Sequence, residues 1–292
     1  MVILYCLTAR AENNQPGDST KKAGADSSKY FFHFDPLQLR LHTPVELDGL
    51  QTPSIGLNKQ GEKFVDEYLA KNSRMLKQIK EKHPSYFTIM DDVLTRYGLP
   101  TEVKYLAIIE SQLNAKIVSP AGAAGAWQLM PVTARNFSLK VSAKNDERKH
   151  FYKSTVAAAK YLTYLYQKFD DWLLVIAAYN GGPGTVYKAI KKSGSRNFWK
   201  LQNYLPKETR DHVKRFISTH YYYEGEGSIA TLSKEEVLTY REKMNTFVAR
   251  QNAMLEEKQL NKIKSATDEC PEEEQGSIVA NNSVLLKTEE EK

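Results

Sequence analysis

The chain has 292 residues, 41% of them hydrophobic, with a formal charge of +6 and a pI near 9.0. This length fits one domain with tails, and the apolar residues suffice for a core in the middle of the chain. The positive charge suits an acidic partner or solubility alone, but Lys and Arg form no dense stripes of the nucleic-acid-binding kind. Cys6 and Cys270 lie near the two ends and the six histidines follow no ligand spacing, so we expect no metal, cofactor or core disulfide.

The N-terminal segment predicts an export signal followed by a linker. Residues 1–11 contain an apolar run and end in Ala-Arg-Ala, a small-x-small cleavage pattern, although the basic start of a signal peptide is missing. A frayed cytosolic N-terminus is the alternative. Residues 12–44 begin with a stretch rich in Asn, Gly, Ser, Asp and Lys and are expected to form a disordered linker. No segment has 18 successive apolar residues, so none is expected to span a membrane.

Between the ends, apolar residues recur with the period of a helix. The pattern predicts helices at 59–82, 87–97, 101–113, 155–169, 172–179, 185–192 and 208–222, and a polar one at 234–262. Gly98 and Pro100 form a stop signal between the second and third helices. Strand patterns are nearly absent, so we predict an all-α domain at 45–225, a polar helical extension at 226–265 and a disordered acidic tail at 266–292.

Glu110 is a candidate general acid. Leu106 lies four residues before it and Leu113 three after it, which places the carboxyl on the apolar stripe of the third helix. Burying an ionised carboxyl is costly, so desolvation raises its pKa and lets it hold a proton near neutral pH. The alternative is a glutamate at a helix end that reaches water or pairs with a lysine.

Two segments rich in small residues follow. In residues 119–131 (SPAGAAGAWQLMP), Trp127 is suited to stack on a sugar and Gln128 to bond a hydroxyl or amide. The alternative is a tight turn between helices, with Trp127 in the core. In residues 177–184 (AAYNGGPG), the Tyr179 hydroxyl is suited to bond Glu110 or a substrate oxygen. A plain helix terminator explains the glycines alone.

Together these segments resemble the family 1 lytic transglycosylases, which carry the SLT domain, and most closely the membrane-bound type D subgroup. The resemblance covers roughly residues 45–223 and rests on Glu-Ser at 110–111, Gly-Ala-x-Gly-x-x-Gln-x-Met-Pro at 122–131 and Ala-Tyr-Asn-x-Gly at 178–182. Flanking pieces agree: Gly-Leu-Pro at 98–100, Asp-Glu-Arg at 146–148 and Leu-Pro-Lys-Glu-Thr-Arg at 205–210. The chain departs from the pattern in two ways. No LysM wall-binding repeat is recognisable, and His212 stands where an aromatic Tyr is expected.

The resemblance implies a lysozyme-like, mostly helical domain with a groove for a glycan strand. In that family a glutamate in the position of Glu110 is the catalytic residue. The resemblance also implies a set of residues at the substrate: Ser119, Gln128, Met130, Tyr179 and Asn180. It implies no cofactor, a peptidoglycan strand and no nucleic acid as partner, and a periplasmic or cell-envelope location with membrane association through the N-terminus. The oligomeric state stays open, with a monomer expected.

The activity implied is cleavage of the MurNAc-β-1,4-GlcNAc bond without water, giving 1,6-anhydroMurNAc ends with one glutamate as acid and then base. Three alternatives remain from the residues alone. A goose-type lysozyme of the same fold would use water, a binding module would hold glycan without cutting it, and a cytosolic scaffold would bind no sugar. The sequence does not separate cutting at chain ends from internal cutting.

Overall fold

The structure is a computed structural model that describes residues 52–268. This part of the chain divides into a first unit, residues 54–239, and a second unit that includes the residues from Tyr240 onward. The predictions of a signal peptide at 1–11, a linker at 12–44 and an acidic tail beyond Asp268 lie outside the described residues, as do Cys6 and Cys270. The boundaries at 45 and 225 stay predictions.

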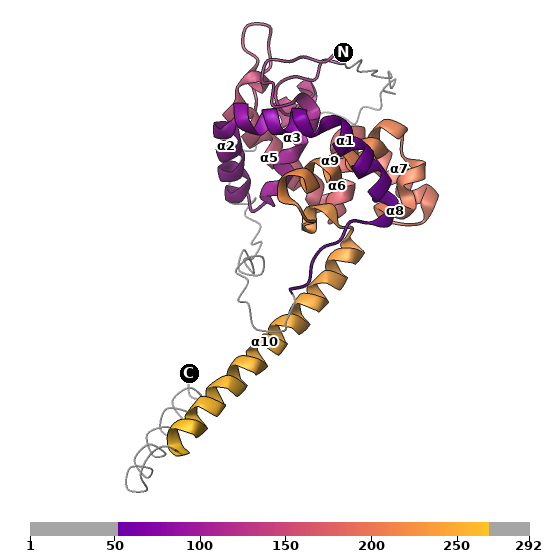
Figure 1. Cartoon of the computed structure of the whole chain (residues 1–292). Coiled ribbons are helices and arrows are strands. Elements are labelled where there is room, and N and C mark those ends of the chain that lie inside the picture. The colour runs from indigo at the N-terminus through magenta and orange to yellow at the C-terminus, as the bar shows by residue number, and fades with distance from the viewer. Residues whose placement is uncertain (1–51, 269–292) are drawn as a thin grey trace, which may run out of the picture. The chain divides into compact units, whose positions relative to one another are not determined.

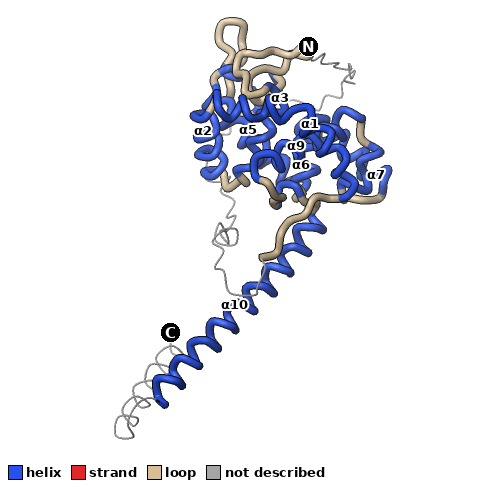
Figure 2. The backbone as a smooth tube through the Cα atoms, in the orientation of Figure 1, coloured by secondary structure: helices blue, strands red, loops and turns tan. Residues whose placement is uncertain are grey.

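The first unit is built from helices (Figure 1). In chain order they are α1 (Lys59–Lys82), α2 (Pro84–Arg96), α3 (Tyr105–Ser111), α4 (Pro131–Asn136), α5 (Phe151–Phe169), α6 (Trp172–Gly181), α7 (Pro183–Ser193), α8 (Phe198–Leu201), α9 (Lys207–Glu224) and the first turns of α10 (Lys234–Asp268). Single 3₁₀ turns are η3 (Thr101–Lys104), η4 (Glu147–Lys149), η5 (Gln202–Tyr204) and η6 (Ile229–Thr231). Figure 2 shows no strand among the described residues. The predicted all-α architecture is confirmed.

The predicted third helix is shorter than its apolar pattern. Residues 101–104 form η3, and α3 ends at Ser111 because Gln112 and Leu113 adopt left-handed φ angles of 55° and 61°. Such angles are costly for side chains with a Cβ, and successive residues seldom share them. The short α4 and α8 were missed because six and four residues are too few for a helical period to show.

Helix α6 lies at the centre of the core. Every residue from Trp172 to Ala178 is buried, and the helix packs against α5, α7 and α9. A helix that is apolar on every side needs neighbours on every side. Asp171 caps its N-terminus by accepting a hydrogen bond from the Leu174 amide at 3.1 Å. Helix α9 packs against α6 and also against α3 and α1, so side chains of α3 and α9 meet.

A buried arginine holds the loop between α3 and α4. Arg148 donates to the Asp146 carboxylate from Nε at 2.9 Å and from Nη2 at 2.8 Å. Its Nη1 donates to the carbonyls of Gly122 at 2.6 Å and Leu129 at 3.0 Å. The side chain of Arg148 is 7% exposed, so its bonds to the loop are shielded from water. The pKa of Asp146 is lowered, chiefly by this hydrogen-bonded pair. The motif at 146–148 therefore fixes the shape of the loop.

The second unit contains the rest of α10, from Tyr240 to Asp268. The prediction of a polar helix at 234–262 is confirmed. Its large apolar side chains are partly exposed, with Leu255 at 42%, Leu260 at 52% and Ile263 at 49%. Within residues 52–268, no helix combines the length and the apolar character that a membrane span requires.

We predict that Gly125→Ala destabilises the first unit far more than Gly122→Ala. Both glycines have positive φ, +81° and +86°, so an added Cβ costs each about 1 kcal/mol of backbone strain. At Gly125 that Cβ would also lie 1.9 Å from the Arg148 carbonyl oxygen, whereas at Gly122 nothing lies within 4 Å. Urea unfolding should give a further loss of at least about 2 kcal/mol for Gly125→Ala. Equal losses in the two variants would contradict the close approach.

Candidate active site

Glu110 lies in the last turn of α3 with its side chain 16% exposed. Its neighbours Leu106, Ala107 and Ile108 are at most 1% exposed, so the carboxyl stands in the apolar setting that the sequence predicts. Burial raises the pKa of Glu110 to about 8. The positive charge of Arg215 opposes this rise and the negative charge of Glu208 adds to it. The carboxyl therefore carries a proton at neutral pH while one edge stays open to solvent.

His212 of α9 faces this carboxyl. Its Nε2 lies 3.4 Å from Oε1 of Glu110, and its side chain is 2% exposed. Burial, with the nearby charge of Arg215, lowers the pKa of His212 to about 3. The imidazole is therefore neutral across the physiological range, and its contact with Glu110 is not an ion pair.

Ser111 fixes the end of the helix that carries Glu110. Its hydroxyl donates to the carbonyls of Ala107 at 3.2 Å and Ala126 at 2.7 Å. The second bond joins α3 to the loop that Arg148 holds. The Glu-Ser pair of the motif thus combines a candidate acid with its anchor.

Tyr179 of α6 and Trp127 of the loop meet beside the candidate acid. The Tyr179 hydroxyl donates to the Trp127 carbonyl at 2.7 Å, and its ring lies 5.4 Å from that of Tyr161. Burial raises the pKa of Tyr179, and the charge of Glu110 adds to the effect, so the two side chains are near neighbours. Trp127 is fully buried, and its indole donates to Thr155 Oγ1 at 2.9 Å. Trp127 is therefore a core residue, and the idea that it stacks on a sugar is wrong.

Three predicted substrate residues lie along the same loop. The Ser119 hydroxyl accepts a hydrogen bond from the Ala123 amide at 3.0 Å. The Gln128 side-chain amide donates to the Gly125 carbonyl at 2.8 Å, and its backbone has a left-handed φ of 45°. Met130 is 44% exposed. Ser119 and Gln128 thus shape the loop, whereas Met130 is presented to solvent, and their part in binding substrate stays a prediction.

Asn180 joins α6 to α9. Its Oδ1 accepts a hydrogen bond from Thr209 Oγ1 at 2.9 Å. The next residue, Gly181, lies so close to Thr209 that an added Cβ would come within 2.7 Å of the same hydroxyl oxygen. The Asn-Gly pair after Tyr179 therefore permits a close approach of α6 and α9, the helix that carries His212.

Many glycosidases use a second carboxylate beside the general acid, but the acidic residues nearest the motif segments have other partners. Asp146 binds Arg148, Glu147 binds Lys153, and Asp170 and Asp171 both bind Lys234. Glu208, an exposed residue at the start of α9 whose charge acts on Glu110, was not predicted as a site residue. It belongs to the Leu-Pro-Lys-Glu-Thr-Arg segment at 205–210, which is one of the flanking pieces of the family resemblance. The described part of the chain gathers no group of three or more His, Cys, Asp or Glu side chains able to hold a metal ion.

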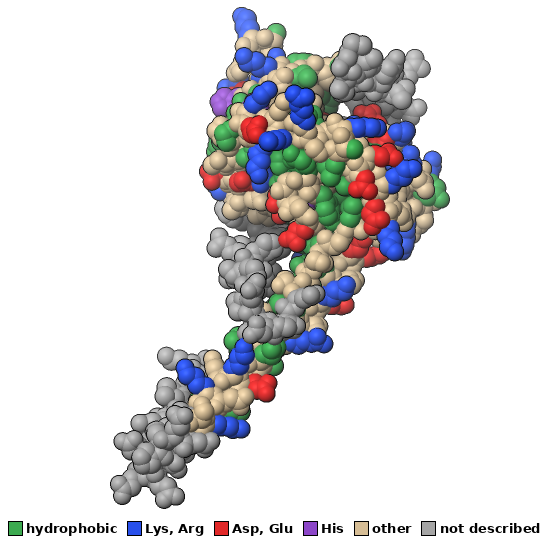
Figure 3. Space-filling model, in the orientation of Figure 1, with side chains coloured by type: hydrophobic (Ala, Val, Ile, Leu, Met, Phe, Trp, Pro, Cys, Tyr) green, Lys and Arg blue, Asp and Glu red, His purple; other side chains and the backbone are tan. Residues whose placement is uncertain are grey.

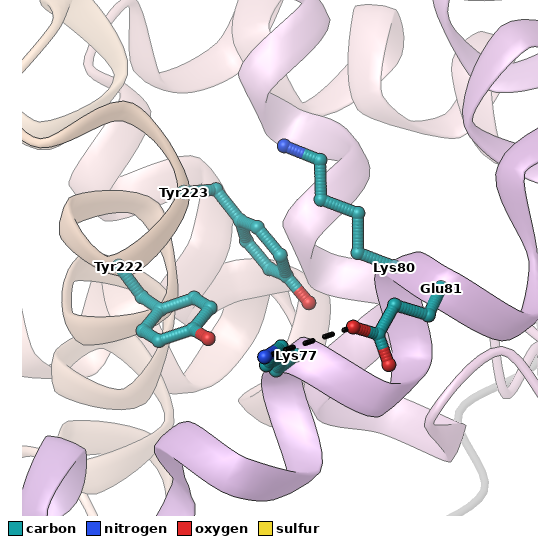
Figure 4. Close-up of a pocket in the computed structure, with 5 residues that line it drawn as sticks. All are labelled: Lys77, Lys80, Glu81, Tyr222 and Tyr223. Atoms are coloured by element: carbon teal, nitrogen blue, oxygen red, sulfur yellow. Dashed lines mark ion pairs between the residues drawn. The ribbon is translucent and has the colours of Figure 1, made fainter.

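A separate hollow of about 400 Å³ lies between α1 and the end of α9 (Figure 4). It is lined by Lys77, Lys80, Glu81, Tyr222 and Tyr223. Lys77 pairs with Glu81 at 3.9 Å, and the Lys80 ammonium lies 5.7 Å from the centre of the Tyr223 ring. None of the predicted site residues lines this hollow.

We predict that Glu110→Gln removes a pH dependence of stability. Because the pKa of Glu110 rises from 4.5 to about 8 on folding, the native state binds one more proton than the unfolded chain within that window. The free energy of unfolding should therefore fall by roughly 1.4 kcal/mol per pH unit between those values. Below pH 4.5 this group causes no loss of stability, and above about pH 8 the loss is complete. Gln cannot ionise, so urea unfolding from pH 4.5 to 8 should show the variant gaining on wild type. Parallel curves would show that Glu110 titrates normally.

Comparison with known proteins gives one matching family. Residues 91–202 match the family model described as the transglycosylase SLT domain. The membrane-bound lytic murein transglycosylase D of Escherichia coli K12 is 38% identical over 157 residues, 52% of this chain and 34% of that protein. The soluble lytic murein transglycosylase of Salmonella typhimurium LT2 is 31% identical over 157 residues, 50% of this chain and 24% of that protein.

A solved structure, that of the 70 kDa soluble lytic transglycosylase of Escherichia coli, is 29% identical and covers 50% of this chain and 26% of the other, with a TM-score of 0.43. This chain spans about a third or less of the length of these relatives. The matched range contains Glu110 and all five predicted substrate residues, whereas Glu208 and His212 lie beyond it. The similarity of this chain to the transglycosylase SLT domain thus lies in residues 91–202.

Proposed function

We propose that this protein is a peptidoglycan lytic transglycosylase with Glu110 as its catalytic acid and base. The observation that carries the proposal is a carboxyl with a pKa of about 8 at the end of α3, inside the range that matches the SLT domain. Its relatives in Escherichia coli and Salmonella are named as murein transglycosylases. An acid that keeps its proton at neutral pH is what cleavage of a glycosidic bond requires.

The first step protonates the leaving group. Glu110 donates its proton to the oxygen that joins N-acetylmuramic acid to N-acetylglucosamine, and the bond from C1 to that oxygen breaks. The 2-acetamido group of the muramic acid stabilises the positive charge that develops at C1, in a substrate-assisted route. The burial that raises the pKa of Glu110 in the free enzyme keeps the proton on the carboxyl at neutral pH, so that it is present when the glycosidic oxygen binds.

The second step closes a ring on the same sugar. Ionised Glu110 takes the proton of the 6-hydroxyl while that oxygen attacks C1, which gives a 1,6-anhydro product and restores the acid. No water is consumed, and one carboxyl serves both steps because the nucleophile belongs to the substrate. Glu208 is exposed, and neither step of this route requires a proton transfer by it.

Five other side chains are assigned to the glycan strand. Met130 and Gln128 line the groove from the loop, and Ser119 bonds substrate near the scissile bond from the same loop. Tyr179 and Asn180 hold the opposite side from α6. The loop bonds of Ser119 and Gln128 support the proposal, because a pre-shaped loop loses little freedom when it binds.

The proposed place of action is the cell envelope, in contact with peptidoglycan. Stem peptides of peptidoglycan carry carboxylates, which suits a chain of net charge +6. Figure 3 shows Lys and Arg side chains spread over this face of the first unit among acidic and polar ones. Such a surface favours an anionic polymer without concentrating charge at one point.

We predict that the purified protein releases muropeptides that end in 1,6-anhydromuramic acid. Mass spectrometry of the soluble products should show each one lighter by one water than its hydrolysed counterpart. Glu110→Gln should release at least about a hundredfold less, because Gln cannot donate a proton. Circular dichroism of the variant serves as the control for folding.

Two other outcomes would contradict the proposal. Products with an ordinary reducing end would show that water attacks C1, as in a lysozyme-type hydrolase, and would direct attention to Glu208. Binding to peptidoglycan without release of any product by the wild-type protein would indicate a glycan-binding module.

We predict that Met130→Ala weakens glycan binding but leaves the stability of the protein nearly unchanged. This side chain is 44% exposed, so Met130→Ala should change the free energy of unfolding by less than about 0.5 kcal/mol. Loss of an apolar contact with the sugar should raise KM for soluble glycan fragments several-fold, with kcat little changed. Val132→Ala is the matched control, since Val132 is 65% exposed and lies two residues further along. An unchanged KM for Met130→Ala would remove this residue from the groove.

A further inference from the structure

His212 has a place beside Glu110 that the mechanism above does not use. Its Nε2 lies 3.4 Å from Oε1 of Glu110, and this buried nitrogen has no hydrogen-bond partner among the described residues. A buried polar group left without a partner destabilises the folded state. Oε1 of Glu110 is the group placed to satisfy it.

We propose that His212 is a positioning residue, whose Nε2–H donates a hydrogen bond to Oε1 of Glu110 and leaves the other carboxyl oxygen to carry the transferred proton. The inference rests on the proposed function, because it assigns His212 a part in the same reaction. It also gives a role to a residue that stands where the family resemblance leads one to expect tyrosine.

The proposed direction of the bond agrees with the charge states. With the transferred proton on the other oxygen, Oε1 is the carbonyl oxygen of the acid, and in the ionised form it is part of the carboxylate, so it accepts a hydrogen bond in both. Burial keeps the imidazole of His212 neutral, so it retains one N–H and adds no second charge. At 3.4 Å the contact is long, as catalytic hydrogen bonds often are before substrate binds.

The other groups around Glu110 act differently. Arg215 and Glu208 of α9 influence its ionisation through charge, in opposite directions. The Tyr179 hydroxyl of α6 donates its hydrogen bond to the Trp127 carbonyl at 2.7 Å, so it has no second hydrogen to donate to Glu110. His212 is the group whose nitrogen lies against the carboxyl itself, and it therefore fixes which oxygen faces the substrate.

Three substitutions test the bond. His212→Gln places an amide N–H near the position of Nε2, His212→Asn places one near Nδ1, and His212→Phe keeps a ring without a donor. The proposal expects Phe and Asn to lower kcat for release of anhydro products by about tenfold or more, with KM within about twofold. Gln should restore most of that loss. Thermal unfolding of each variant separates this effect from a loss of packing.

A second measurement does not need activity. Carbon-13 NMR of glutamate side-chain carboxyls, with Glu110→Gln to assign the signal, gives the pKa of Glu110 directly. Removing a donor to the carboxylate destabilises the charged form, so Phe and Asn should raise this pKa and Gln should return it towards wild type.

The outcomes separate the two proposals. If the wild-type protein yields no anhydro product, the proposed function fails, while the titration still decides whether the hydrogen bond exists. If the wild-type protein is active and neither kcat nor the pKa of Glu110 differs among the variants, the role of His212 is overturned and the function stands. Equal losses in all three variants, following their melting temperatures, would show a packing role and overturn it as well.

Discussion

The burial of one ionisable carboxyl is the constraint on which the rest of the site depends. Glu110 stands on an apolar helix end, and this setting raises its pKa to about 8. The surroundings bury most of the carboxyl and leave 16% of the side chain exposed. A neutral imidazole on α9 and a tyrosine on α6 close the sides without supplying a charge partner that would return the carboxyl to an ordinary pKa.

The loop between α3 and α4 is held by bonds that have little to do with proton transfer. Arg148 binds two of its carbonyls, Ser111 binds a third, and Gly125 allows the chain to pass against the Arg148 backbone. Left-handed residues at 112, 113 and 128 add local strain that these contacts maintain. Rigidity of this kind places a loop side chain such as Met130 at low entropic cost.

Much of the fold was accessible from the sequence, because long amphipathic helices such as α1 show their period plainly. The end of α3 was not, since its apolar pattern continues to Leu113 while tertiary contacts turn the chain at Gln112. In the site, Glu110 was predicted from its apolar neighbours. The role of Trp127 was undecided between stacking on a sugar and packing in the core, because an indole suits both. His212 and Glu208 could not be given a role, since their proximity to Glu110 comes from packing of α9 on α3, which no local pattern encodes.

The central position of α6 also bears on when the acid comes into being. This helix is covered in part by α9, which follows it by some 26 residues in the chain and carries His212 and Arg215. In the unfolded chain Glu110 is exposed to water and titrates as an ordinary carboxylate, ionised at neutral pH. A chain that is synthesised but not yet folded therefore holds no proton donor at this position. Glu110 becomes a proton donor at neutral pH only when the core around it is complete, so folding itself prevents premature cleavage.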